Sequence, residues 1–219
     1  MLHTEKSSTE VLLRDADYHL ARLQGDENTA ELATNTVDAI ERLRAIRREV
    51  DSKKVIEKTL RDTTRVAVKN LLMALRYVRN AVTMAVEFDR NSPGYRAIWP
   101  QGADWINNDV GDTLVGKAEE LAHVLGRYFP AIADLHGDQL NQAIQRVKNA
   151  RRSYLEARVT VGGAFRNLVH IRAELTDKMR ANKGLILGIY PRDRNRRGKF
   201  FRTGRKNGRH ADDSAYRID

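Results

Sequence analysis

The strongest constraint on the fold is an apolar stripe in the C-terminal half of this 219-residue chain. Its members recur at alternating steps of four and three residues over ten successive positions, which is the spacing of a heptad seam. A seam of this length predicts a long helix that packs along one face against another helix. The partner helix could belong to the same chain or to a second copy. The seam residues are Ala143, Val147, Ala150, Tyr154, Ala157, Val161, Ala164, Leu168, Ile171 and Leu175.

The first half of the chain predicts a second long helix. Proline is absent from residues 1–92, and apolar residues recur at steps of three and four through the later part of that range. Ser8 and Gly25 are residue types that begin and end helices, so a short first helix is expected between them. The long helix then runs from about residue 29 to about residue 90. Polar residues 51–54 interrupt its stripe, and an unbroken or bent helix is favoured there over a turn.

The helical pattern breaks at residues 89–111, where Pro, Gly, Asn and Asp are typical of turns. The same loop carries both tryptophans, Trp99 and Trp105. A loop with so much apolar surface is expected to fold back and plug a hydrophobic core. A ligand or partner pocket is the alternative. A third helix is expected at about residues 112–127, followed by a turn at 131–137.

The last long helix, which carries the seam, is expected from about residue 138 to about residue 182, with Gly184 as its stop. Two glycines, Gly162 and Gly163, lie in its middle. They indicate a crossing point, a close contact or a bend, because glycine otherwise weakens a helix. The apolar run 185–190 follows the expected stop and is predicted to be extended.

These elements predict an all-α protein. Residues 1–184 are expected to form an elongated antiparallel helical bundle, or coiled-coil hairpin, of two long and two or more short helices. Residues 185–219 are expected to form an extended C-terminal arm, first apolar and then basic. No run of about 18 apolar residues is present, so no transmembrane segment is expected. The lack of cysteine and of a secretory signal favours a cytoplasmic protein, and a phage or archaeal setting fits as well.

Motifs for catalysis are absent from the sequence. Without cysteine there is no thiol nucleophile and no Cys-ligated zinc site. Phosphate-binding loops, a nucleophile elbow and the zinc-protease motif are also missing. Glu120 and His123 form one Glu-x-x-His motif, but di-iron bundles need two such motifs and two further glutamates. We therefore expect a solvent-facing pair there, no catalytic residue, no metal, no cofactor and no enzymatic activity.

Positive charge is concentrated at the C-terminus. The net charge of the chain is +10, yet residues 1–110 contain 17 basic and 17 acidic side chains. Residues 191–219 contain ten basic and four acidic ones. Such a patch attracts phosphate groups, acidic protein surfaces or anionic membranes. The residues predicted to bind an anionic partner are Arg192, Arg194, Arg196, Arg197, Lys199, Phe200, Phe201, Arg202, Arg205, Lys206 and Arg209.

Two functions fit this charge, and a tail that only keeps the protein soluble is a third possibility. In the first, a non-enzymatic structural or interaction protein self-associates through its heptad seams and docks residues 191–210 on an acidic protein surface. In the second, a packaging or architectural protein binds nucleic acid, with Phe200 and Phe201 stacking on unpaired bases. Basic side chains of the last helix, such as Arg151, Arg158 and Arg172, either pair with carboxylates of the opposing helix or extend this surface.

Overall fold

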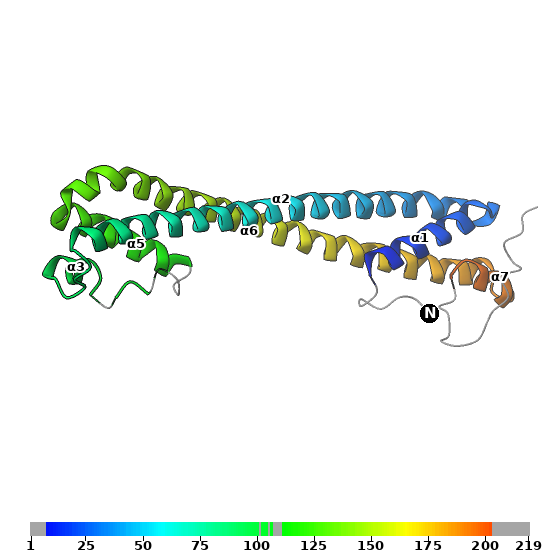
Figure 1. Cartoon of the computed structure of the whole chain (residues 1–219). Helices are drawn as coiled ribbons and strands as arrows, with labels where there is room; N and C mark the ends of the chain where they lie inside the picture. Colours follow the sequence, from blue (N-terminus) through cyan, green and yellow to red (C-terminus); the bar gives the residue numbers. More distant parts are fainter. Residues whose placement is uncertain (1–7, 101, 105, 107–110, 203–219) are drawn as a thin grey trace, which may run out of the picture. The chain divides into compact units, whose positions relative to one another are not determined.

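The computed structural model describes residues 8–100, 102–104, 106 and 111–202 of the chain. Within these residues every regular element is a helix, which confirms the predicted all-α class (Figure 1). The helices are α1 (Thr9–Gln24), the short 3-10 turn η1 (Glu27–Thr29), α2 (Ala30–Ala85), α3 (Pro93–Ile98), α5 (Gly111–Tyr128), α6 (Pro130–Ile189) and α7 (Arg194–Lys199).

The start of α1 and the course of α2 follow the expectations from sequence. The Ser8 hydroxyl accepts a hydrogen bond from the backbone N–H of Val11 and caps α1. Helix α2 continues without a break through residues 51–54, because this polar stretch contains neither proline nor glycine. It ends at Ala85, several residues early. Glu87 and Phe88 adopt φ angles of 49° and 66°, which an α-helix cannot continue.

Helix α6 is longer at both ends than the sequence indicated. The predicted turn at residues 131–137 is wrong, since α6 already begins at Pro130. Proline suits the first helical position, because the N–H that it lacks would have no partner there. The predicted stop at Gly184 and the extended run 185–190 are also wrong, because the helix continues to Ile189. Ile186 is buried two helical turns after Met179, and this packing outweighs the weak helix propensity of glycine.

Contacts divide the chain into two compact units. The terminal unit comprises the described parts of residues 1–50 and 164–219, and the central unit those of 51–163. Both boundaries fall inside a helix, one in α2 and one in α6, whereas the boundary expected from sequence lay at residue 184. Each unit has its own hydrophobic core.

The core of the central unit is built from α2, α5 and α6, and α3 packs on α5. Trp99, which follows α3, is only 2% exposed and belongs to this core. The indole therefore plugs a core, as predicted, whereas Trp105 lies outside the described residues. The core includes Leu71, Leu75, Val78 and Val82 of α2, Leu114, Leu121 and Leu125 of α5, and Leu140, Ile144 and Val147 of α6.

The core of the terminal unit joins α1, the first part of α2 and the last part of α6. A smaller cluster beside it contains Leu23, Ala33, Ile186 and Phe200. The main cluster includes Leu12, Leu13 and Ala16 of α1, Ala39, Ile40 and Leu43 of α2, and Leu168, Leu175 and Met179 of α6.

None of the nine seam residues from Val147 to Leu175 is fully exposed. Those that are partly buried are Ala150, Tyr154, Val161 and Ile171, and those that are buried are Val147, Ala157, Ala164, Leu168 and Leu175. In each unit the seam shares a core with residues of α2 from the same chain.

The glycine pair of α6 lies where the two units divide, since the central unit ends at Gly163. A Cβ atom built on Gly163 meets no heavy atom within 4 Å, so a close contact, one of the three roles considered for the glycine pair, is absent at this position. We predict that Gly163→Ala raises the free energy of unfolding by about 1 kcal/mol, because alanine restricts the unfolded chain. Thermal unfolding followed by circular dichroism should show a midpoint about 2–4 °C higher. A lower midpoint would show that α6 needs glycine here.

Candidate anion-binding site

Residues 190–202 fold back on the end of α1 through a polar cluster around Asp26. The Asp26 carboxylate accepts hydrogen bonds from the Tyr190 hydroxyl at 2.5 Å and from Arg196 Nη2 at 2.8 Å and Nε at 3.1 Å. The Arg196 guanidinium also lies over the Tyr190 ring, 4.4 Å from its centroid. The hydrogen bond from Tyr190, aided by those from Arg196 and the Asn28 N–H, lowers the pKa of Asp26. Arg196 is thus held by a carboxylate of its own chain.

A second contact anchors the end of this segment at His19, whose side chain is fully buried. Its Nδ1 lies 2.9 Å from the carbonyl oxygen of Phe200, and its Nε2 lies 3.1 Å from Asn182 Nδ2. Asn182 Nδ2 also donates to Thr36 Oγ1 at 2.9 Å. The amide of Asn182 can only donate at this atom, so His19 Nε2 accepts and Nδ1–H donates to Phe200. This network assigns a neutral imidazole, and burial lowers the pKa of His19 in the same sense.

These contacts correct the predicted extended arm. Between residues 191 and 202 the chain forms the helix α7 and then packs its two phenylalanines inward. Phe200 is 3% exposed and belongs to a core cluster, and the Phe201 ring stacks on His19 with centroids 4.6 Å apart. Phe200 therefore cannot stack on an unpaired base, and one face of Phe201 is already occupied.

Docking of α7 beside the end of α6 creates a groove of about 660 Å³. Five of its lining residues are cationic and none is acidic. Three large apolar residues, Ile186, Leu187 and Phe201, share this lining with the cations, and we call them the apolar floor. The lining residues are Arg180, Lys183, Gly184, Ile186 and Leu187 of α6, Arg194, Arg197 and Gly198 of α7, and Phe201 and Arg202 after it. We call this feature the basic groove.

The cations of the basic groove differ in how far they are already engaged. Arg180 pairs with Asp177 at 2.8 Å, Arg197 donates to the carbonyl oxygen of Pro191 at 3.0 Å, and Arg202 lies 3.9 Å from Asp15. Among the described residues, neither Lys183 nor Arg194 has an ion-pair partner. The two side chains are thus available to a bound anion.

A neighbouring hollow of about 410 Å³ lies between the end of α1 and α7. Its walls carry both signs, because Asp26 and Asp193 line it together with Arg22, Arg196 and Lys199. The Asp26–Arg196 pair neutralises part of this wall, so the hollow attracts anions less strongly than the basic groove does.

The structure distributes the predicted anion-binding residues over several environments. Arg194, Arg197, Phe201 and Arg202 line the basic groove, whereas Arg196 and Phe200 hold the segment in place. Lys199 lines the mixed-sign hollow, and Arg192 lies exposed between α6 and α7. Arg205, Lys206 and Arg209 lie outside the described residues.

Sequence reasoning missed several residues of this region. Arg180, Lys183 and Leu187 follow one another at helical spacing, which could have indicated a shared face of α6. The roles of Asp26, His19 and Asn182 left no such signal, because their partners lie more than 140 residues away in the sequence.

None of the remaining polar candidates lines the basic groove. Glu120 and His123 are exposed on α5, and no group of three or more His, Cys, Asp or Glu side chains is placed there to hold a metal ion. Arg151 pairs with Asp112 of α5, with Nη2 and Oδ2 2.8 Å apart. Arg158 is exposed.

Comparison with known proteins gives no match to a family model, a curated protein or a solved structure. Among the described helices, none has both the length and the hydropathy needed to cross a bilayer.

Proposed function

We propose that this chain is a non-enzymatic interaction protein that binds an acidic partner protein in the basic groove between α6 and α7. The observation that carries the proposal is the composition of the groove, where five cations and no carboxylate line an apolar floor. The two long helices act as the scaffold that presents it. We include in the proposal that α2 and α6 pair antiparallel with coiled-coil-type packing, which their shared cores in both units support.

The apolar floor favours a protein segment as the ligand. Leu187, which lines the groove, is 53% exposed and so presents apolar surface to a ligand. An acidic amphipathic segment would place carboxylates on the cations and apolar side chains on the floor. Exposed ion pairs contribute only about 0.2–1 kcal/mol each, so burial of the floor supplies much of the affinity.

Nucleic acid is the second candidate, and the choice of cation favours it. Four of the five groove cations are arginines, whose planar guanidinium group can bind a phosphate through two hydrogen bonds. Residues 164–202 contain eleven basic and three acidic side chains, so the charge extends beyond the groove along α6. Base stacking would contribute little, because Phe200 is buried and Phe201 packs on His19.

The test is charge reversal at the two groove cations that have no ion-pair partner among the described residues. We expect Lys183→Glu combined with Arg194→Glu to weaken binding of a labelled helical peptide, with glutamates on one face and leucines on the other, at least about tenfold. Fluorescence anisotropy measures this over about 50–200 mM salt. The matched control is Arg158→Glu with Arg166→Glu, two exposed arginines of α6 outside the groove.

The outcomes separate the two candidates. The acidic-protein function is supported if the groove variant loses peptide binding and the control variant retains it. The nucleic-acid function would be favoured instead if the chain binds an oligonucleotide of about 20 nucleotides tightly and in a salt-sensitive way but does not bind the peptide. If neither probe binds at low salt, or if both variants weaken binding equally, the groove is not the binding site.

A further inference from the structure

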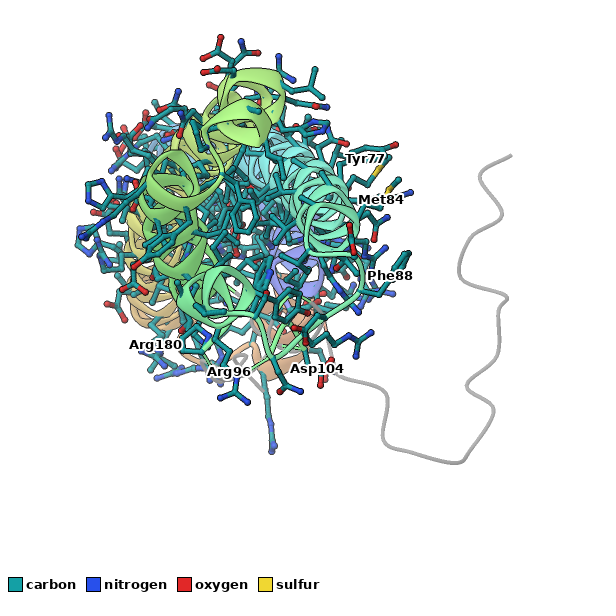
Figure 2. All side chains as sticks on the ribbon, turned by 60° about the vertical axis from the view of Figure 1, so that its left-hand side comes forward. Tyr77, Met84, Phe88, Arg96, Asp104 and Arg180 are labelled. Carbon is teal, nitrogen blue, oxygen red and sulfur yellow. The ribbon has the colours of Figure 1, made fainter. Side chains whose placement is uncertain are left out.

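Helix α2 has a second apolar stripe in the central unit, separate from the face that enters the core. Its large side chains are Val66, Met73, Tyr77 and Met84, all exposed, and Met84 reaches 68%. The core side of the same helix is formed by other residues, such as Leu75 and Val78, which are fully buried. Figure 2 shows Tyr77, Met84 and Phe88 projecting together from one side of the helix. An aligned stripe of this size on a soluble helix indicates a contact surface.

The stripe has the spacing of a helix–helix seam. Residues 66, 70, 73, 77, 80 and 84 follow one another at steps of four and three, and they span about 27 Å of helix. Asn70 and Asn80 are the polar members. Both are exposed, like the apolar members, so the whole seam faces outward from the described part of the central unit.

The order of residues in this seam is self-complementary. If a second copy of α2 lies antiparallel with its centre between residues 73 and 77, Val66 faces Met84, Met73 faces Tyr77 and Asn70 faces Asn80. Every apolar residue then meets an apolar residue, and every asparagine meets an asparagine. A paired asparagine within a seam selects one register, because other registers would bury it against an apolar side chain. A two-fold axis perpendicular to the helices creates these pairs, so an antiparallel pair of α2 requires a palindromic order of this kind.

The end of the stripe carries an unusual backbone. Phe88 has a φ of 66° and its side chain is 74% exposed, directly after Glu87 with a φ of 49°. Its N–H bonds to the carbonyl oxygen of Thr83 at 2.9 Å, which closes the helix. Left-handed backbone is unfavourable for residues other than glycine, and here it holds an apolar ring in solvent beside Met84. In the antiparallel pair this ring would cover the layer formed by Met84 and Val66 of the second copy.

We infer that the stripe formed by Val66, Asn70, Met73, Tyr77, Asn80 and Met84 is the interface of an antiparallel homodimer. The heptad seam of α6 cannot serve this purpose, since it packs within the chain. A contact of this length lies at the small end of specific interfaces, so we expect dissociation at micromolar concentrations. Since the contact is apolar, salt should not weaken it, in contrast to binding at the basic groove.

Sedimentation velocity of the full chain over about 1–200 μM tests the dimer. We expect a shift from the mass of one chain to twice that mass. Met73→Glu combined with Met84→Glu should keep the chain monomeric throughout, because it buries carboxylates in the seam. The matched control is Leu135→Glu with Val159→Glu, two exposed apolar residues of α6 in the same unit, which should leave the dimer intact.

Because the chain lacks cysteine, single cysteines can report the register. Positions 73 and 77 face each other in the antiparallel pair, whereas positions 66 and 77 do not. We therefore expect a mixture of Met73→Cys and Tyr77→Cys chains to form a disulfide-linked heterodimer at least about tenfold faster than a mixture of Val66→Cys and Tyr77→Cys chains. The inference is overturned if the mass stays that of one chain at all concentrations. The stripe would then bind a different partner. A dimer that survives the double glutamate variant, or equal cross-linking of both mixtures, overturns it as well.

Discussion

Replacing Trp99 with alanine is expected to lower the free energy of unfolding of the central unit by about 3–5 kcal/mol. The indole is 2% exposed and lies in a core shared by α2, α5 and α6. Its removal leaves a cavity in this core, which adds to the free energy lost with the buried ring. Domains are stable by only about 5–15 kcal/mol, so much of the stability of the unit would be lost.

Urea unfolding of the full chain, followed by circular dichroism, measures the effect of Trp99→Ala. Hydrogen exchange then assigns the loss to the central unit, because the two units need not unfold together. Tyr128→Ala is the control. This aromatic residue is 46% exposed, so its removal should cost less than about 1 kcal/mol. A loss for Trp99→Ala no larger than that of the control would contradict the role of the loop as a core plug.

Acidification is expected to destabilise the terminal unit and to release α7. His19 is neutral and buried, and burial lowers its pKa below the usual value of 6.5. As the pH falls through 6.5, the unfolded chain takes up a proton at this residue while the folded chain does not. Folding stability therefore falls from about pH 6.5 downwards, by up to about 1.4 kcal/mol per pH unit, until the folded histidine also protonates. Above this range the residue adds no pH dependence.

Protonation of His19 would disrupt its contacts directly. A charged imidazole donates at both nitrogens, so Nε2–H would face the amide hydrogens of Asn182. The groups around the ring are the Asn182 amide, the Phe200 carbonyl and the Phe201 ring. On α1 the buried carboxylate of Asp15 lies one turn before His19, and it is within 4 Å of Arg14 and Arg202.

Hydrogen exchange of α7 and thermal unfolding between pH 7.5 and 5 would test this effect. We expect faster exchange in α7 and a lower midpoint at pH 5. Glutamine at position 19 retains a neutral donor and acceptor, so His19→Gln should remove the added loss between pH 7 and 5. The exposed His170 supplies the control, since its side chain contacts Glu174 of α6 and not α7, so His170→Gln should leave the hydrogen exchange of α7 as it is in the unmodified chain. If His19→Gln and the unmodified chain respond identically to pH, a different group causes the response.

The positions of the helices could largely be predicted because their signals are local. Periodic apolar residues, the cap at Ser8 and the proline-free stretches placed α1, α2 and α5 within a few residues. The misjudged ends of α6 have one cause in common. Pro130 and Gly184 can either end a helix or lie within one, depending on their surroundings. At the C-terminal end, burial of the Ile186 side chain favours continuation of the helix past Gly184.

The candidate sites show where local information ends. The concentration of positive charge near the C-terminus is a property of composition, so the sequence alone predicts attraction to anions. The sequence does not reveal that α7 lies beside the end of α6, because this depends on Asp26 and His19, whose contacts with Arg196 and Phe200 span 170 and 181 residues.

Sequence alone therefore determined the all-α class, the long helices and the region of positive charge. These follow from residue order over one or two helical turns and from counting charges. Tertiary structure alone decided which apolar stripe enters a core and which stays exposed. It also decided which cations line a groove, because burial and ion pairing depend on distances between segments far apart in the chain.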